Sequence, residues 1–414
     1  MSDRADDEGN TDMVVAGGED PIVALPDDVR RYLMSFLPSR DAVRTCVLAK
    51  SWRTFWKSVP ALRISDPESF EGAHGLSTFV DELIRLRDPV PLNVCDISSA
   101  VHYDPDPSCD FDRRDGEFRR MEPWLKHAVS NRVQVLRVRF VCWVTNMTLV
   151  SSHLKRVEFY DVKFEGRCLD FSSCQVLEVL ELNNCQIFAN ISSKSLRHLK
   201  IDGSVLRGFY ARIRIFAPNL TSFQLVAFSG LAPFLESMPS LVTASVKLGG
   251  AYIGECMDCC SCGNRSCEGC TVQTGNNDSS VVLKSLSGAM NLELTTEDNM
   301  IVYRNYLKCY PFFGKLKTLL LNQWCMVDNF TVLVYFLHHS PILEVLTLQL
   351  HFETREEQLV TETDESYNSS VPSIISNHLK VVKIICDTKE DARLHHILTI
   401  LCTHGVPSEQ IDIQ

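Results

Sequence analysis

The 414-residue sequence predicts an α/β solenoid, in which a long body of short repeats follows a small all-α module. An apolar-x-x-apolar-x-apolar pattern returns at a nearly regular interval through much of the chain. Residues 21–62 instead space their apolar residues at a helical period. Hydrophobic residues make up 45% and charged residues 22%, as in an ordinary folded protein.

The N-terminal segment and the overall charge limit the class of protein. Residues 1–20 are rich in Asp, Glu and Gly, so we predict a disordered acidic tail without the features of a secretory signal. No stretch reaches the ~18 consecutive apolar residues of a membrane span. We therefore expect a nuclear and/or cytoplasmic protein without a membrane partner, whose 17 cysteines are mostly reduced. The net charge of -11 argues against a nucleic-acid partner.

The module at residues 21–62 begins with residues that are typical of a helix N-terminus. Pro26 occupies a position that a first helical turn accepts, and Asp27 and Asp28 favour the positive end of the helix dipole. Pro38 ends this helix, and two shorter helices are expected after it. The first helix carries one apolar face, formed by Val29, Tyr32, Leu33, Phe36 and Leu37.

Two interpretations of the module are open at this point. It could be a three-helix cap that covers the end of the repeat body, or a docking module for another protein. About forty residues bury too little surface to cover all these apolar side chains by themselves. The spacing of the residues does not choose between the two.

The order of the residues adds a resemblance. The module is similar to the F-box of plant F-box proteins through Leu25-Pro26-Asp27-Asp28-Val29, Ser35-Phe36-Leu37-Pro38-Ser39-Arg40-Asp41-Ala42-Val43-Arg44-Thr45-Cys46-Val47-Leu48, Trp52-Arg53 and Trp56. One departure is that Leu48-Ala49-Lys50-Ser51-Trp52 stands where the family often reads Leu-Ser-Arg-Arg-Trp. The departure removes one positive charge but keeps the tryptophan.

The resemblance implies a partner. An F-box binds a Skp-type adaptor, which links it to a cullin, and the expected physics is an apolar helix–helix interface. The residues that the resemblance assigns to adaptor binding are Leu25, Pro26, Val29, Leu33, Leu37, Val43, Cys46, Leu48 and Trp52. Some of them must form the core of the module, and the sequence does not sort the two groups.

The repeat pattern starts near residue 130. Its units begin 21, 23, 19, 24 and 21 residues apart, close to the period of leucine-rich repeats, in which each unit is a short strand plus a return segment. Cys185 stands where such repeats carry Asn or Cys. The units are Val133/Leu136/Val138, Leu154/Val157/Phe159, Leu177/Leu180/Leu182, Leu196/Leu199/Ile201, Leu220/Phe223/Leu225 and Leu241/Ala244/Val246.

The pattern returns with wider spacing in residues 281–414. We predict helices over 329–337 and 391–402 and a final strand over 410–413. This part resembles the FBD region of plant F-box/leucine-rich-repeat proteins, and the layout resembles the grass set, which includes meiotic F-box proteins. That likeness rests on Phe313-Gly314-Lys315-Leu316-Lys317-Thr318-Leu319, Ser340-Pro341-Ile342-Leu343-Glu344-Val345-Leu346 and His378-Leu379-Lys380-Val381-Val382.

A cysteine-rich loop over residues 251–280 separates the two sets of repeats. Two Cys-x-x-Cys pairs, Cys256/Cys259 and Cys267/Cys270, have the spacing of a thiolate zinc site. The seven residues between the pairs are fewer than in common zinc ribbons, and six cysteines exceed four ligands. These features favour an exposed insertion with reduced thiols over a zinc site.

No enzyme motif emerges. The sequence has no phosphate loop, no dinucleotide fingerprint, no His-Glu-x-x-His and no Gly-x-Ser-x-Gly, so we expect no catalytic residues and no cofactor. We expect a substrate-recognition subunit of a Skp-cullin-F-box (SCF) ubiquitin ligase with an unknown protein substrate. The alternative is a repeat-based binding scaffold outside any ligase.

The expected domains are 1–20, the tail; 21–62, the F-box; 63–130, a linker and the start of the body; 131–250, the repeats; 251–280, the loop; and 281–414, further repeats with the FBD-like region.

Overall fold

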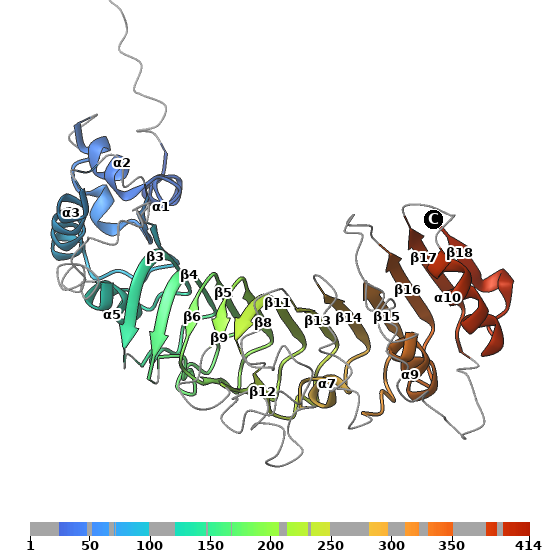
Figure 1. Cartoon of the computed structure of the whole chain (residues 1–414). Coiled ribbons are helices and arrows are strands. Elements are labelled where there is room, and N and C mark those ends of the chain that lie inside the picture. Colours follow the sequence, from blue (N-terminus) through green and yellow to red (C-terminus); the bar gives the residue numbers. More distant parts are fainter. Residues whose placement is uncertain are drawn as a thin grey trace, which may run out of the picture.

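The protein forms a long curved sheet with a helical module at its N-terminal end (Figure 1). No helix within the described part of the chain is long and apolar enough to cross a membrane. The computed structural model describes residues 25–47, 52–65, 70, 72–98, 121–145, 148–166, 168–206, 213–230, 233–248, 281–296, 311–322, 330–350, 378–386 and 392–414.

The sheet is parallel, and its main strands follow one another in chain order. It begins with two strands, β1 and β2, that lie before the first unit of the sequence pattern. The main strands are β1 (Ala61–Ile64), β2 (Val94–Ser98), β3 (Val135–Thr145), β4 (Arg156–Glu165), β5 (Val179–Asn183), β8 (His198–Asp202), β11 (Ser222–Gly230), β13 (Thr243–Leu248), β14 (Asn291–Thr296), β15 (Thr318–Asn322), β16 (Val345–Leu350), β17 (Val381–Cys386) and β18 (Ile411–Ile413). This is the arrangement expected of a repeat body.

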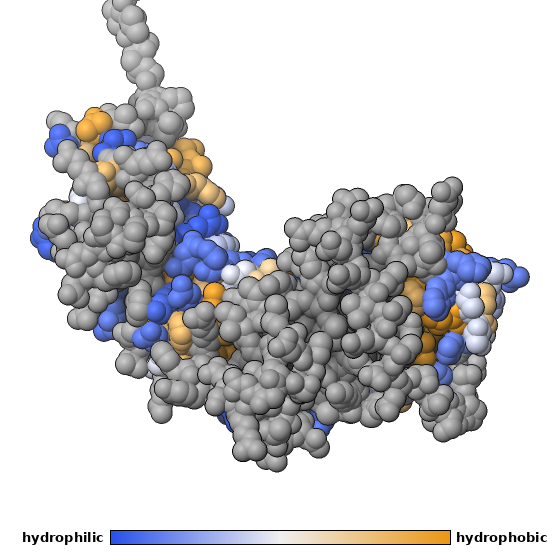
Figure 2. Space-filling view, in the orientation of Figure 1, coloured by the Kyte–Doolittle hydropathy of each residue, from blue (hydrophilic) through white to orange (hydrophobic). Residues whose placement is uncertain are grey.

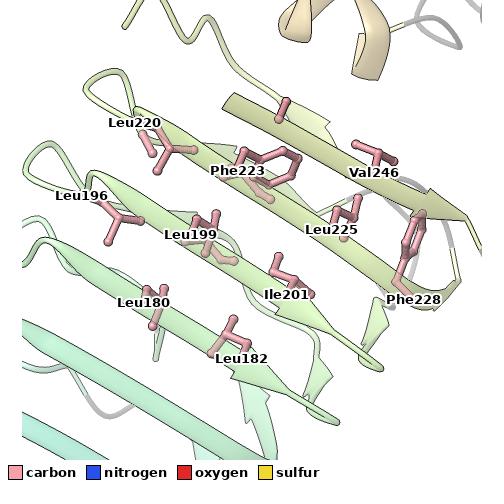
Figure 3. Close-up of a cluster of buried hydrophobic side chains, with 14 of the residues drawn as sticks. Leu180, Leu182, Leu196, Leu199, Ile201, Leu220, Phe223, Leu225, Phe228 and Val246 are labelled. Atoms are coloured by element: carbon pink, nitrogen blue, oxygen red, sulfur yellow. The ribbon is translucent and has the colours of Figure 1, made fainter. Parts of the chain in front are cut away.

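The pairing register places the repeat leucines directly beside one another. Leu182 pairs with Phe159 on one side and with Ile201 on the other, and Ile201 pairs with Leu225. Figure 3 shows Leu182, Ile201 and Leu225 on neighbouring strands, each beside the next. All are at most 2% exposed, because each unit covers the apolar face of the next. The predicted six units therefore form one continuous core.

Four successive repeat units turn at the same position, called the corner below, and the apolar pattern did not predict this turn. A residue with a positive φ follows the first strand segment of four successive units, at Asp161, Asn184, Gly203 and Ala227. Asp, Asn and Gly tolerate this left-handed conformation best. Beyond the corner the chain pairs again, in the second half of β4 and in β6 (Gln186–Ile187) and β9 (Val205–Leu206).

The return segments differ along the body. In the middle they are extended and form a small second sheet of β7 (Ile191–Ser192), β10 (Arg214–Phe216) and β12 (Phe234–Leu235). Elsewhere they contain helices, and Figure 1 shows β12, α7 and α9 along the convex side. These helices are α3 (Gly72–Leu86), α5 (Met121–Ser130), α7 (Val281–Leu286), α9 (Thr331–His339) and α10 (Ala392–Thr403). The helices predicted over 329–337 and 391–402 and the strand over 410–413 are confirmed.

The described part of the N-terminal module is mainly helical. It includes α1 (Asp27–Met34), α2 (Ser39–Arg44) and the 3-10 turns η1 (Thr45–Val47) and η3 (Phe55–Ser58). The buried side chains of Met34, Ala42 and Trp56 belong to the same hydrophobic core as strand β1. The module is therefore joined to the sheet through packed side chains as well as through the chain.

Candidate docking surface

Helix α1 forms as its sequence predicts. Pro26 has an extended backbone at the N-cap, and its carbonyl accepts the first helical hydrogen bond from the Arg30 amide at 3.0 Å. Asp27 and Asp28 lie in the positive first turn. The helix ends at Met34, three residues earlier than expected at Leu37, and tighter turns continue to Pro38 because a residue before proline avoids the helical conformation.

The apolar face of α1 points away from the core. Tyr32 is 61% exposed and Leu33 is 49% exposed, while Met34 is 2% exposed on the opposite side. The Tyr32 and Phe36 rings pack edge to face with centroids 5.0 Å apart. Figure 2 shows hydrophobic residues at the surface of the N-terminal module. The exposed apolar face, named so below, consists of Val29, Tyr32, Leu33, Phe36 and Leu37.

A basic residue occupies the inward side of α1. Arg30 is only 9% exposed, and its guanidinium lies 4.5 Å from the centroid of the Phe55 ring. It also pairs with Asp27, whereas its Nε and Nη1 atoms have no hydrogen-bond partner among the residues that the structure describes. Arg31 donates a hydrogen bond from Nε to Ser58 Oγ at 3.0 Å. These contacts turn the two arginines toward η3, and the apolar face consequently turns toward solvent.

The structure sorts the residues assigned to adaptor binding. Trp52 is buried in the core of the module, and Val43 and Cys46 are half-buried against it. Leu25 is half-buried beside α1, and Leu48 lies outside the described residues. The outward members are Pro26, Val29, Leu33 and Leu37. The assignment to adaptor binding stays a prediction for all nine.

Three further residues extend the surface. Tyr32 and Phe36 belong to the same face of α1, and Val47 at the end of η1 is 83% exposed. The helical spacing already placed the first two on this face, but the assigned list left them out. The exposure of Val47 follows from the packing of η1, which carries no periodic signal.

The outward face of the sheet is a second candidate surface. Around β3 to β5 it carries an ionic network, in which Glu158 accepts Arg137 Nε at 3.0 Å and Arg156 Nε at 2.5 Å. Arg156 also reaches Glu181 at 2.6 Å. Glu158 is 5% exposed, so its charge is compensated by two guanidinium groups rather than by water.

Toward the middle, the outward face changes character. The cross-strand row that carries Glu158 and Glu181 continues with Lys200, Gln224 and Ser245. Val242 and Met290, which directly precede β13 and β14, are 39% and 40% exposed. Between the ionic network and Glu293 on β14, the row therefore contains the uncharged polar side chains of Gln224 and Ser245. Such a surface loses water at a lower cost than a charged one.

Cysteine and histidine side chains form no metal site within the described residues. Cys256, Cys259, Cys267 and Cys270 lie outside the described residues. Among the residues that the structure describes, no group of three or more His, Cys, Asp or Glu side chains could hold a metal ion. The His338 ring packs against the His404 ring, with centroids 5.4 Å apart. Burial and the neighbouring histidines lower the pKa of His338.

Comparison with known proteins agrees with this geometry. The F-box domain family matches residues 22–63, which include α1, α2 and η3. An FBD-associated F-box protein of Arabidopsis thaliana is 30% identical over 55% of this chain and 60% of its own length. An F-box/FBD/LRR-repeat protein of the same plant is 24% identical over 88% of this chain and 85% of its own length. The rice meiotic F-box protein MOF is 27% identical over 80% and 71%.

These observations define the class of the protein. A helical module that matches the F-box domain stands before a parallel sheet of repeated strands, so the chain is an F-box protein. Within that class it belongs to the plant F-box/FBD/LRR-repeat proteins. F-box proteins of this kind generally act as substrate-recognition subunits without catalytic residues of their own.

Proposed function

We propose that this chain is the substrate-recognition subunit of an SCF ubiquitin ligase. The exposed apolar face of α1 docks a Skp-type adaptor, which links the chain to a cullin. The repeat body, an α/β solenoid, binds a protein substrate for ubiquitination and degradation. The chain itself performs no chemistry and acts by proximity, because it holds a substrate lysine near the ubiquitin-charged enzyme.

One observation carries the adaptor part of this proposal. The module turns five large apolar side chains toward solvent, although it has a buried core on its other side. A monomer gains nothing from such a face, and contiguous exposed apolar patches mark interaction sites. A cap on the repeat body would point this face toward the sheet. The face instead suits a partner with an apolar helical surface.

The substrate part rests on the outward face of the sheet. Inward side chains of each strand already complete the core, so the outward ones are available for binding. Gln224 and Ser245 place uncharged polar side chains on the middle strands of the sheet, and the exposed apolar Val242 and Met290 directly precede β13 and β14. Exposed apolar side chains combined with polar ones are common in protein-binding surfaces. We further propose that the protein acts in the nucleus and/or the cytoplasm.

The test is co-purification of the full chain with a purified Skp-type adaptor. We compare the unchanged chain with the double variant Leu33→Ala, Leu37→Ala. Both side chains are exposed, at 49% and 38%, so their truncation leaves the fold intact. Loss of two central apolar contacts weakens binding by about a hundredfold.

The matched control is Val150→Ala, which truncates an exposed valine of the repeat body. It keeps the affinity of the unchanged chain for the adaptor. The proposal fails if the folded, unchanged chain does not bind the adaptor. It also fails if the double variant binds as tightly as the control.

A further inference from the structure

A half-buried arginine joins the F-box module to the repeat body. Arg87 directly follows α3, and its guanidinium donates hydrogen bonds to three backbone carbonyls, one in η3, one in β1 and one in the segment between them. Nη1 reaches the Trp56 oxygen at 3.4 Å and the Ala61 oxygen at 3.2 Å, while Nη2 bonds the Val59 oxygen. Burial lowers the pKa of Arg87 to about 10, so the side chain remains charged at neutral pH.

The backbone continues the same connection. The Asp88 amide donates to the Lys57 oxygen at 3.1 Å, and the Asn93 amide donates to the Pro60 oxygen at 2.8 Å. The stretch that leads from the F-box into the first strand is therefore held on one side by the end of α3. A guanidinium suits this task because its planar array of donors can satisfy several carbonyls at once.

Arg63 in β1 makes a second connection from the opposite direction. Its amide donates to Ser39 Oγ at 2.9 Å, and its Nε donates to the Ser35 oxygen at 2.7 Å. Its Nη1 lies 3.7 Å from Asp96 Oδ2 on β2. One side chain thus touches the end of α1 and the second strand of the sheet.

Between the two arginines lies a shared apolar core. Met34, Ala42, Trp56 and Leu83 come from α1, α2, η3 and α3, and together with Arg87 they surround one small, closely packed space. No flexible linker separates the module from the sheet at this junction. The orientation of the exposed apolar face relative to the outward face of the sheet is therefore determined by side-chain contacts.

We propose that Arg87 is a positioning residue that fixes the angle between the adaptor-docking face and the substrate-binding sheet. This inference rests on the proposed ligase function, because the angle matters only if both faces are occupied at once. In such a complex a fixed angle holds the substrate lysine at one distance from the charged enzyme. A loosened junction spreads that distance and slows transfer without touching either binding surface.

The test compares Arg87→Met with Arg85→Met in the full chain. Arg85 lies two residues earlier, is exposed and pairs with Glu82 on its own helix, so it is a matched control. Hydrogen exchange of the free chain is measured at the Arg63, Asp88 and Asn93 amides. We expect at least tenfold faster exchange in Arg87→Met and unchanged exchange in Arg85→Met, with the remaining sheet amides unaffected in both.

A second readout separates positioning from stability. Ubiquitin transfer to a lysine-bearing peptide fused after Gln414 is measured at saturating Skp-type adaptor, together with the Kd for that adaptor. Arg87→Met should keep the Kd within twofold and lower the transfer rate at least fivefold. If Arg87→Met does not fold, Arg87→Lys keeps the charge with fewer donors and should show the same changes to a smaller extent.

Three outcomes have distinct meanings. Unchanged exchange in folded Arg87→Met overturns the junction role of Arg87. Faster exchange with an unchanged transfer rate overturns its positioning role. Failure of the unchanged chain to bind the adaptor overturns the proposed function, and the exchange result still reports on the junction by itself.

Discussion

The F-box module and the repeat body use apolar side chains in opposite ways. In the body, alternate residues of every strand face inward, and Leu180, Leu182 and Leu199 are at most 1% exposed. In the module, the most regular apolar face, that of α1, lies in solvent. Both patterns are equally clear in the sequence. The difference is that each repeat is covered by a neighbouring repeat of the same chain, whereas nothing in the described chain covers α1.

The largest predicted effect is a difference in stability between a leucine-to-alanine substitution in the body and the same substitution in the module. Leu182→Ala removes a fully buried side chain and should lower the free energy of unfolding by about 2–5 kcal/mol. Leu33→Ala, on the exposed face, should change it by less than about 0.5 kcal/mol. Urea denaturation of both variants measures this difference. A similar loss at Leu33 would show that the module is packed against something in the free chain.

A smaller effect is expected at the ionic network of the outward face. Glu158→Ala leaves Arg137 and Arg156 without the carboxylate that they share. Since both guanidinium groups remain partly exposed, at 31% and 38%, water compensates in part, and the loss should be about 1–2 kcal/mol. Glu158→Gln keeps the shape and the hydrogen-bond acceptor and should lose less. Equal losses in the two variants would mean that packing, not charge, is what Glu158 supplies.

The smallest predicted effect concerns the buried thiols of the body. Burial raises the pKa of Cys95 and of Cys185 to about 12 from an ordinary value near 9. The unfolded chain therefore loses these protons at lower pH than the folded one. The stability that depends on the neutral thiols is complete below pH 9 and decreases above it, by about 1 kcal/mol per thiol at pH 10.

Comparison with Cys95→Ala and Cys185→Ala isolates this contribution from that of lysines and tyrosines. Each variant should lose less stability between pH 8 and pH 10 than the unchanged chain does, although its stability at pH 8 is lower. Identical pH profiles in all variants would contradict the assigned cause.

Local patterns predicted much of the fold because their physical causes are local. The spacing of Leu177, Leu180 and Leu182 follows from the alternation of a strand, and each of these residues is buried as expected. Helix α10 and strand β18 were also predicted within a residue. Residues 63–130 were expected to hold a linker and the start of the body, but β1 and β2 were not predicted as individual strands. Only two isolated units stand there, separated by helix α3, and a period needs several repeats to be recognised.

The candidate site was predicted less completely. The sequence placed Leu33 and Trp52 in one list of adaptor contacts, yet one is exposed and the other lies in the core. Ser39 is the first residue of α2, and its hydroxyl accepts a hydrogen bond from the Arg63 amide of strand β1. Both outcomes depend on partners far away in the sequence, which no local spacing contains.

The sequence by itself determined the repeat period, the existence of α1 with its apolar face and the resemblance to the F-box, because each depends on residues within a few turns of one another. Only the tertiary structure decided which way that face points. Arg30 and Arg31 reach Phe55 and Ser58, and Arg87 donates hydrogen bonds to the Trp56 and Ala61 carbonyls. These contacts join residues that only folding brings together, and they hold the inward side of α1 against η3, so the apolar face points outward.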